Sequence, residues 1–474
     1  MTWIVLGSFA LIGFNFTFWA FIGLVRASLE RFNSSRQKKT LRASWKIIRV
    51  FALFGKLALL MFFLLMVVIL GGVLRPAAQW VRKKREARTK LHLAVQRITP
   101  QETCAMVPAH NEELSIAATL KALKKIIPAQ NIYVGSDAST DRTAELAREL
   151  GVNVADINPN RGKAGVLVFL LRNFKLSERY RAIMIVDADA EVSPFYLQYA
   201  LPLFDDPKVV AVAGHGSTKW PEERGVSWAK FFLAYRVRLW RLVQYGMRYG
   251  QTWKYSNTTY IVPGSPSIYR ASALSKLEID APNLVIEDFN MTFELHKKRL
   301  GKIAYDTRVS GVHQDPYTLN DYIKQIRRWY LGFWQTVRRN GFWPSFFWLA
   351  TGSFVIEMAL YSAFILCLPL LILWFFMDGF EPVTLPSWFI ITWVDSLTFM
   401  DILVGVFIMD YILTAIAAVL ERRPELLFYG LGFFVIRYID AFMYLYTLPL
   451  AFAVKSTGAW TSPRRRATQV TISS

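Results

Sequence analysis

Acidic side chains follow short β-rich runs in the middle of the chain. Asp137 comes directly after one run, and Asp187 and Asp189 follow the apolar run 182–186. Two carboxylates two residues apart on an extended backbone point the same way and repel each other, which is tolerable if a hard cation lies between them and a diphosphate. A lone Asp-x-Asp pair also occurs in solvated turns, but the apolar strand before this one favours a site. The spacing therefore predicts that Asp187 and Asp189 bind a divalent metal.

These residues need a scaffold that brings strand ends together. The β-rich runs are 103–107, 131–136, 153–157, 181–186 and 209–213. Helical patterns lie between them, near 112–126, 141–150, 163–175 and 193–204. This alternation predicts an α/β domain with a mainly parallel sheet covered by helices on both faces, and ligands of such sheets bind outside the carboxyl ends of the strands.

A structural alternative exists for the second polar loop. Ser139 and Asp141 could equally serve as helix caps, since both residue types are favoured at helix N-termini. His110 and His313 have no supporting partners in the sequence, and we interpret both as structural or loop residues.

The composition separates this chain from ordinary soluble enzymes. Of its 474 residues, 19% are charged and 53% are hydrophobic, and the mean hydropathy is +0.26. Soluble domains carry about a quarter charged residues, and disordered chains are far less apolar. Two cysteines exclude a disulfide-stapled scaffold. The class that remains is an integral membrane protein with a formal net charge of +21.

The apolar segments lie at the two ends of the chain. Residues 1–25, 57–74 and 358–377 carry no charged side chain, and each is close to the roughly 20 residues that cross a bilayer as a helix. Two further apolar stretches, 386–420 and 426–454, contain isolated charges.

These segments predict four parts. We expect an N-terminal membrane segment of about two transmembrane helices with basic flanks (1–98), a cytoplasmic α/β domain (99–340), a C-terminal membrane segment of about three to four helices (341–456) and a basic cytoplasmic tail (457–474).

Much of the positive charge flanks apolar segments. The positive-inside rule would place the basic clusters at 26–49 and 75–97 both in the cytoplasm. If the two N-terminal apolar segments each cross the membrane once, however, these clusters lie on opposite sides. The topology therefore stays open. Between 226 and 248, basic and aromatic residues alternate as in a helix lying in the headgroup plane with snorkelling arginines. A nucleic-acid-binding helix is the rival interpretation, but the adjacent apolar segments favour lipid. A second interfacial helix is expected at 339–356.

The motifs, in their order, resemble a known family, the inverting nucleotide-sugar-dependent glycosyltransferases that include hyaluronan, chitin, cellulose and poly-N-acetylglucosamine synthases. The donor half matches in Val-Pro-Ala-His-Asn-Glu-Glu (107–113), Ser-Asp-Ala-Ser-Thr-Asp (136–141), Asn-Arg-Gly-Lys-Ala (160–164) and Asp-Ala-Asp (187–189). The acceptor half matches in Gly264-Ser265, Glu287-Asp288 and Gln325-Ile326-Arg327-Arg328-Trp329, the last being associated with processive members. The resemblance implies a GT-A-type nucleotide-sugar-binding domain flanked by N- and C-terminal transmembrane and interfacial helices.

The resemblance also implies roles in donor binding. The implied donor-binding residues are Ala109, Glu112, Asp137, Lys163, Asp187, Gln325 and Arg328. Asp137 would accept a hydrogen bond from the uracil ring, and Lys163 would approach the diphosphate as a point charge. Asp187 and Asp189 would hold the UDP and a Mg²⁺ or Mn²⁺ cofactor. Ala138 stands where the family commonly has Gly, which leaves the geometry of this loop open.

For the acceptor side, the resemblance implies a catalytic pair, Glu287 and Asp288. Asp288 would be the general base that takes the proton from the acceptor hydroxyl. Gly264 and Ser265 would let the backbone approach the acceptor, and Trp329 would offer it a flat ring. Trp329 could instead be an interfacial anchor, because further aromatic residues follow it.

These features predict a processive inverting glycosyltransferase, a UDP-sugar-dependent polysaccharide synthase that extends a β-linked polymer and exports it. UDP-N-acetylglucosamine is the first choice of donor. The alternative is a non-processive transfer of a single sugar to a lipid or polyprenyl-phosphate acceptor. A transporter or membrane-surface binding protein with an inactive domain is the rival from another class, and the presence of Asp187, Asp189 and Asp288 argues against it.

The expected location is the cell (inner) membrane, with the catalytic domain in the cytoplasm. The expected partners are the UDP-sugar, the growing polysaccharide or lipid acceptor and membrane lipids, without nucleic acid; a possible accessory subunit is left open. Within the last apolar region, Arg437 and Asp440 are three residues apart and could neutralise each other, or such residues could line a partly polar path for the polymer.

Overall fold

The computed structural model describes residues 18–20, 22–23, 26, 97–221, 227–377, 383–384, 396–397 and 399–454. The predicted span 57–74, most of the span 1–25 and the predicted tail 457–474 lie outside the described residues.

An eight-stranded sheet lies at the centre of the α/β part, in the order β3-β2-β1-β4-β7-β6-β8-β5. Its strands are β1 (Thr103–Ala109), β2 (Ile132–Asp137), β3 (Asn153–Ile157), β4 (Ala182–Ile185), β5 (Glu191–Val192), β6 (Val209–Thr218), β7 (Ser267–Arg270) and β8 (Lys302–His313). Parallel pairing joins β3, β2, β1 and β4 and also joins β6 with β8. β7 runs antiparallel between β4 and β6, and β5 runs antiparallel to β8. The predicted mainly parallel α/β sheet is confirmed, with two antiparallel strands added.

Helices cover both faces of this sheet. Those of the first half are α4 (Ile116–Lys124), α5 (Thr143–Glu149), α6 (Gly162–Asn173), α7 (Leu176–Arg179) and α8 (Tyr196–Ala200), with 3-10 turns η1 (Pro100–Glu102), η2 (Ala129–Asn131) and η3 (Leu201–Asp205). All seven residues of β1 are buried. The contact between α6 and β2 is so close that a Cβ on Gly135 would lie 2.4 Å from a methyl of Val166. This packing fixes the first turn of α6 beside the end of β2.

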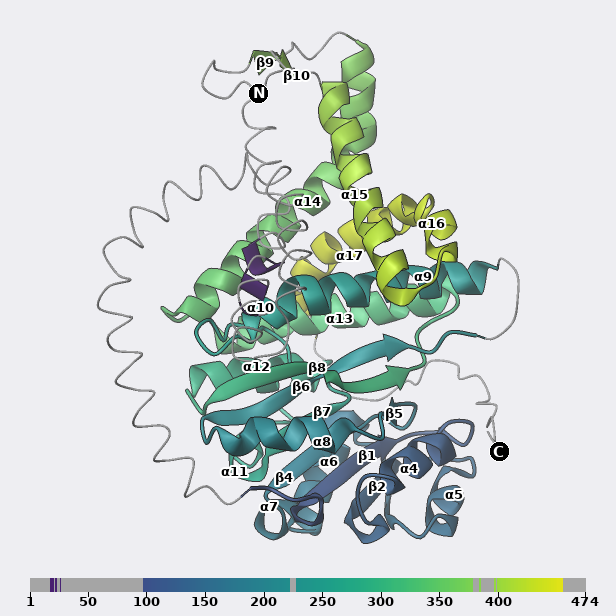
Figure 1. Cartoon of the computed structure of the whole chain (residues 1–474), viewed down its shortest axis with the longest axis vertical. Coiled ribbons are helices and arrows are strands. Elements are labelled where there is room, and N and C mark those ends of the chain that lie inside the picture. Colours follow the sequence, from purple (N-terminus) through teal and green to yellow (C-terminus); the bar gives the residue numbers. More distant parts are fainter. Residues whose placement is uncertain are drawn as a thin grey trace, which may run out of the picture.

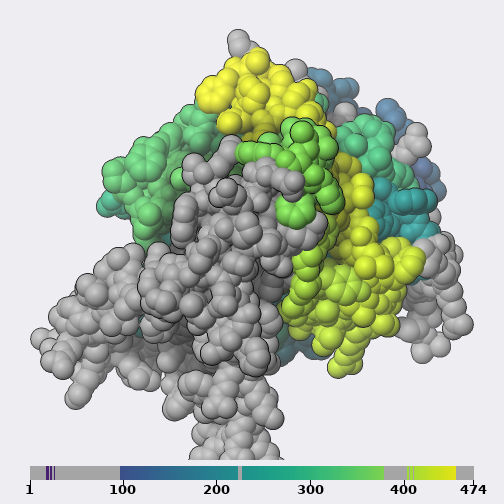
Figure 2. Space-filling model, turned by 90° about the horizontal axis from the view of Figure 1, so that it is seen from above, coloured from purple at the N-terminus to yellow at the C-terminus, as the bar shows by residue number. Residues whose placement is uncertain are grey.

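Some of the remaining helices pack on the sheet, and others lie beyond it (Figure 1). They are α9 (Trp228–Arg241), the π-helix η4 (Leu242–Arg248), α10 (Tyr249–Gln251), α11 (Ala271–Leu274), α12 (Glu287–Lys297), α13 (Leu319–Asn340), α14 (Phe346–Phe376), α15 (Phe399–Glu421), α16 (Glu425–Gly430) and α17 (Phe433–Ala453), with a short hairpin of β9 (Val383–Thr384) and β10 (Ser396–Leu397). α9 and α13 cross above the sheet, and α14 to α17 lie beyond them (Figure 1). From that side, the C-terminal helices form much of the coloured surface (Figure 2).

Two of the described helices, α14 and α17, are long and apolar enough to cross a membrane. α14 begins at Phe346 and runs for 31 residues, so it takes up most of the predicted interfacial segment 339–356 together with the predicted span 358–377. The prediction of a separate second interfacial helix was therefore wrong, because no proline interrupts the chain between 346 and 368 and one helix runs through both segments.

The arginines of α9 are buried in protein, which corrects the expectation that they snorkel to lipid. Arg236 is 0% and Arg238 is 2% exposed. Arg238 pairs with Asp410 of α15, and Arg437 of α17 pairs with the same carboxylate. Asp440 instead accepts hydrogen bonds from the hydroxyls of Tyr235 and Tyr322, at 2.6 and 2.5 Å. The predicted Arg437–Asp440 pair was thus wrong, since each group has a partner on another helix.

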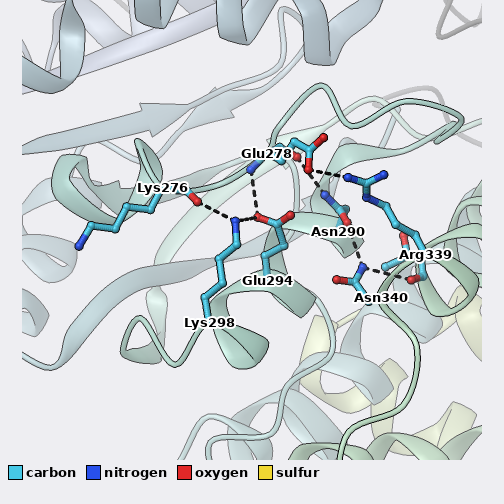
Figure 3. A network of polar contacts seen from close by, with 8 residues as sticks. Lys276, Glu278, Asn290, Glu294, Lys298, Arg339 and Asn340 are labelled. Carbon is cyan, nitrogen blue, oxygen red and sulfur yellow. Dashed lines mark hydrogen bonds and ion pairs between the residues drawn. The ribbon is translucent and has the colours of Figure 1, made fainter.

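A polar network fixes α12 against the end of α13 (Figure 3). Asn340 of α13 donates to Asn290 of α12 at 3.0 Å, and Asn290 donates to the carbonyl of Glu278 at 2.9 Å. Glu294 accepts from the backbone amide of Glu278 at 3.0 Å and from Lys298 at 2.6 Å. These bonds hold the helix that begins with Glu287 and Asp288.

Gly214 of β6 offers a test of this packing. A Cβ at this position would lie 1.8 Å from the carbonyl oxygen of Pro266, next to Ser265. Because backbone must move, we expect Gly214→Ala to lower the free energy of unfolding by roughly 1–3 kcal/mol, measured by denaturant titration in detergent. Gly352→Ala is the matched control, since a Cβ there meets no atom within 4 Å. Equal stability of the two variants would contradict this account.

Candidate active site

Lys163 lies at the centre of a cluster of carboxylates. Its Nζ is 2.8 Å from Oδ1 of Asp187 and 3.1 Å from Oε1 of Glu287. The three residues come from the first turn of α6, the segment after β4 and the start of α12. The end of β4 and the N-termini of α6 and α12 therefore meet at one ammonium group. The Lys163 side chain is 21% exposed.

Asp288 and the segment 264–265 complete the cluster. One carboxylate oxygen of Asp288 accepts from the backbone amide of Gly264 at 3.1 Å, and the other accepts from the amide of Phe289 at 2.7 Å. A Cβ on Gly264 would lie 2.7 Å from Nζ of Lys163 and 3.5 Å from Oδ2 of Asp288. A side chain at this position would therefore displace the Lys163 ammonium group from its place among the carboxylates. The Ser265 hydroxyl accepts from the backbone amide of Asp187 at 2.8 Å.

The charges of the cluster shift one another. Burial, and then the adjacent negative charge of Glu287, raise the pKa of Asp288 to about 7. Burial opposes the positive charge of Lys163, but Asp187 and Glu287 outweigh it and raise the pKa of the ammonium group above its ordinary value. At neutral pH the cluster thus combines a permanent cation with a carboxyl group poised to take or release a proton.

Asp137 holds the start of α6. Its two carboxylate oxygens accept from the backbone amides of Arg161 and Gly162, at 2.7 and 2.8 Å, and its side chain is fully buried. Gly162 has a φ of +69°, a conformation that glycine adopts at no steric cost. Asp137 therefore positions Lys163, and its predicted contact with a uracil ring stays a proposal.

The loops after β1 and β2 are bonded to each other. The side-chain oxygen of Asn111 accepts from the amide of Thr140 at 2.8 Å, and the backbone amide of Asn111 donates to the Ser139 hydroxyl at 3.2 Å. Asp141 accepts from the amides of Thr143 and Glu113, both at 3.0 Å. The helix-cap interpretation thus holds for Asp141, whereas Ser139 joins the two loops.

Other predicted donor residues lie in the same two loops. Ala109 ends β1 and is buried, and Glu112 is buried with its carboxylate accepting from the Ser115 hydroxyl at 2.6 Å. A nitrogen of His110 is 2.5 Å from the carbonyl oxygen of Asp137. His110 therefore has the structural role that we expected.

The motif residues of α13 lie farther along the site. Gln325 accepts a hydrogen bond from Arg236 of α9, Arg328 is exposed, and the Trp329 ring packs beside Trp240 with centroids 5.9 Å apart. The described contacts do not join these three side chains directly to the carboxylate cluster. Sequence reasoning missed Arg236, although its four-residue spacing from Phe232 and Trp240 placed it on an aromatic helix face.

α13 is nevertheless tied to the catalytic segment through its second half. A Cβ on Gly332 would lie 2.9 Å from the Cβ of Ile286, and the amide of Val285 donates to Gln335 at 3.0 Å. The same helix contacts α17, because Trp334 donates to the carbonyl of Tyr444 at 3.1 Å. The residues before Glu287 are thus linked by one helix to an apolar C-terminal helix.

The carboxylates at the end of β4 suit a metal ion that is also bound by the phosphates of a substrate. Within the described ranges, no group of three or more His, Cys, Asp or Glu side chains surrounds one position. Mg²⁺ is commonly held by one or two carboxylates, with substrate phosphates supplying further ligands. Asp187 and Asp189, both partly exposed at the end of β4, fit this mode of binding.

A cavity of about 840 Å³ opens beside Lys163 and Glu287. Its walls are the outer face of α6, including Arg161, Phe169 and Arg172, and the segment 279–286. Two residues of the carboxylate cluster, Lys163 and Glu287, line this cavity.

Comparisons with known proteins find similarity to glycosyltransferases over part of the chain. Residues 182–377 match the family described as "Glycosyl transferase family group 2". The probable glycosyltransferase YdaM of Bacillus subtilis is 29% identical over 240 residues, which are 48% of this chain and 54% of that protein. The undecaprenyl-phosphate mannosyltransferase of Micrococcus luteus is 25% identical over 220 residues, which are 44% of this chain and 83% of that protein.

Among solved structures, the mannosyltransferase PcManGT from Pyrobaculum calidifontis, in complex with GDP-Man and Mn²⁺, is 17% identical with a TM-score of 0.44. The match covers 73% of this chain and 92% of that one. This chain spans about half the length of YdaM, so its own substrates are a matter for proposal. The family match is confined to residues 182–377, and both relatives align with less than half of this chain.

The raised pKa of Asp288 predicts an acid limit to activity. If Asp288 acts as a base, sugar transfer to a hydroxyl should rise with pH through about 7, because only the unprotonated carboxylate accepts the proton. Glu287→Gln removes a neighbouring negative charge, so we expect the acid limb of the kcat/KM profile to move to lower pH.

The matched control is Glu191→Gln, which removes a carboxylate from the edge strand β5. Glu191→Gln should leave the acid limb of the kcat/KM profile at the same pH as in the wild type. An acid limb that Glu287→Gln leaves unmoved would contradict the coupling of the two carboxyl groups.

Proposed function

We propose that this chain, a family-2 glycosyltransferase with a GT-A-type fold, transfers a sugar from a UDP-sugar to an acceptor in the membrane. The first choice of acceptor is a lipid or polyprenyl phosphate. The observation that carries the proposal is the Lys163 ammonium group, held 2.8 Å from Asp187 and 3.1 Å from Glu287, with Asp288 adjacent. This arrangement offers a cation for a diphosphate and a carboxylate for an acceptor at one position.

The transfer step follows from these groups. The acceptor oxygen forms a bond to the anomeric carbon, while the bond from that carbon to the diphosphate breaks and its electron pair leaves with the UDP. Lys163 stabilises the negative charge that grows on the leaving diphosphate. Attack from the face opposite the leaving group inverts the anomeric centre, and a proton lost by an acceptor hydroxyl goes to a carboxylate oxygen of Asp288.

A divalent cation fits the donor side. Asp187 and Asp189 would hold Mg²⁺ or Mn²⁺ together with the donor phosphates, and the metal would supply additional positive charge there. Ala109, Glu112 and Asp137 would lie around the nucleoside. Gln325 and Arg328 are proposed for the diphosphate and Gly264, Ser265 and Trp329 for the acceptor, as the family resemblance implies.

Two observations support an acceptor in the membrane. α13 joins the segment before Glu287 to α17, and both α14 and α17 are apolar and long enough to cross a bilayer. The relative from Micrococcus luteus is named for an undecaprenyl-phosphate substrate. We therefore place the protein in the cell membrane with its α/β part in the cytoplasm.

Polysaccharide extension is the second candidate, and Asp288 is the observation that favours it. A phosphate monoester oxygen already carries negative charge at neutral pH and needs no base, whereas a sugar hydroxyl must lose a proton. A buried carboxyl with a raised pKa is suited to the hydroxyl. Processive export would then use the C-terminal helices next to Trp329.

One assay separates these candidates. Purified protein with Mg²⁺ is incubated with UDP-N-acetylglucosamine, UDP-glucose or UDP-glucuronate, with and without undecaprenyl phosphate, and the products are sized. We expect UDP release to depend on the lipid and to yield one sugar per lipid; a long polymer would favour the second candidate.

Asp288→Asn tests the base in the same assay. It should reduce transfer to a hydroxyl by about 100-fold or more, since general-base catalysis contributes roughly 10²–10⁴-fold. Transfer to undecaprenyl phosphate should fall much less. If the wild-type protein releases UDP from none of the three donors, the proposed function is contradicted.

A further inference from the structure

Arg236 of α9 has an unusual environment for a cation. Its side chain is fully buried, and its guanidinium carbon lies 4.3 Å from the centroid of the Trp329 ring and 5.0 Å from that of Tyr322. One terminal nitrogen donates to Oε1 of Gln325. Nε lies 3.8 Å from Oδ1 of Asp315. The arginine thus contacts three residues of α13, each one turn from the next.

Trp329 is held on its other sides as well. Trp240, one turn after Arg236, contacts the indole and donates to Asp315 at 3.2 Å. Trp329 packs against two hydrophobic clusters, one formed by α9, α13 and α17 and one that contains Ile286 and Phe289. Ile286 and Phe289 flank Glu287 and Asp288 directly, so the second cluster links the surroundings of the indole to the segment that carries the catalytic pair.

An apolar side chain would fill this position more easily. Nε and one terminal nitrogen of Arg236 have no hydrogen-bond partner within the described part of the chain. Burying a cation with incomplete hydrogen bonding opposes folding, and apolar residues of similar volume often stabilise such sites. A planar guanidinium, however, stacks on an indole and bonds a neighbouring amide in one fixed geometry. Arg236 is therefore better suited to fixing the orientation of the Trp329 ring than to stabilising the fold.

We propose that Arg236 is a positioning residue for the acceptor. It acts through Trp329 and Gln325 and fixes the plane of the indole next to the segment 286–289. The inference rests on the proposed function, because it assigns Trp329 to the acceptor substrate rather than to the donor or to the surrounding membrane lipid.

Arg238 provides a matched control on the same helix. It is equally buried, but it faces Asp410 and the ring of Phe433 rather than α13. Arg236→Met and Arg236→Lys remove the stacked guanidinium, and Arg238→Met removes a buried arginine without touching Trp329. A loss that comes only from weakened packing would appear in all three variants.

The first measurement needs no activity. Protein labelled with 5-fluorotryptophan is studied by ¹⁹F NMR, and Trp329→Phe identifies the Trp329 signal. We expect Arg236→Met to shift or broaden this signal and Arg238→Met to leave it unchanged. An unchanged signal in Arg236→Met would overturn the proposal.

The second measurement uses UDP-N-acetylglucosamine and undecaprenyl phosphate as probes. Both Arg236 variants should raise the KM for the lipid at least 10-fold and leave the KM for the donor within 2-fold, whereas Arg238→Met should leave both KM values unchanged. Combining Arg236→Met with Trp329→Phe should add little further loss. Equal changes in both KM values, or an effect shared by Arg238→Met, would overturn the proposal.

The two measurements separate the two claims. If wild type transfers no sugar from this donor to this lipid, the proposed pair of substrates fails. The ¹⁹F signal still decides whether Arg236 orients Trp329.

Discussion

The positive charge of Lys163 is the interaction on which the site depends. Asp187 follows β4, whereas Glu287 and Asp288 begin α12, and three carboxylates this close would repel one another without a cation between them. The fold delivers Lys163 to this place by two devices. Asp137 binds the backbone at the start of α6, and the absence of a side chain on Gly135 lets α6 pack tightly on β2. A donor diphosphate would compete with these carboxylates for the same ammonium group.

α13 connects this site to the apolar helices. Its first half is held by buried groups of α9, and its second half contacts both the segment before Glu287 and the helix α17. Carboxylates of α15 and the loop after β8 neutralise the arginines of α9. Buried ion pairs therefore hold the layer between the sheet and the apolar C-terminal helices.

Local patterns were enough to predict the sheet edge but not the partners of the charges. The acidic residues that end β2 and β4 follow apolar runs, so their place at one edge could be predicted from strand alternation. β7 is four residues long, and its pairing between β4 and β6 depends on distant strands, so the sequence did not reveal it. Arg236 and Arg238 looked like lipid-facing cations because their partners, Gln325, Asp315 and Asp410, lie 79 or more residues away in sequence.

The central claim is that Lys163 binds the donor diphosphate, and UDP binding tests it most directly. Isothermal titration calorimetry with UDP and Mg²⁺ would compare wild type with Lys163→Met and Lys163→Arg, after thermal unfolding has shown that each variant is folded. A hydrogen bond to a charged group contributes about 1.5–3 kcal/mol, so Lys163→Met should bind UDP roughly 10- to 150-fold more weakly, and Lys163→Arg should retain part of the affinity. Equal affinity of a folded Lys163→Met protein for UDP would contradict the account.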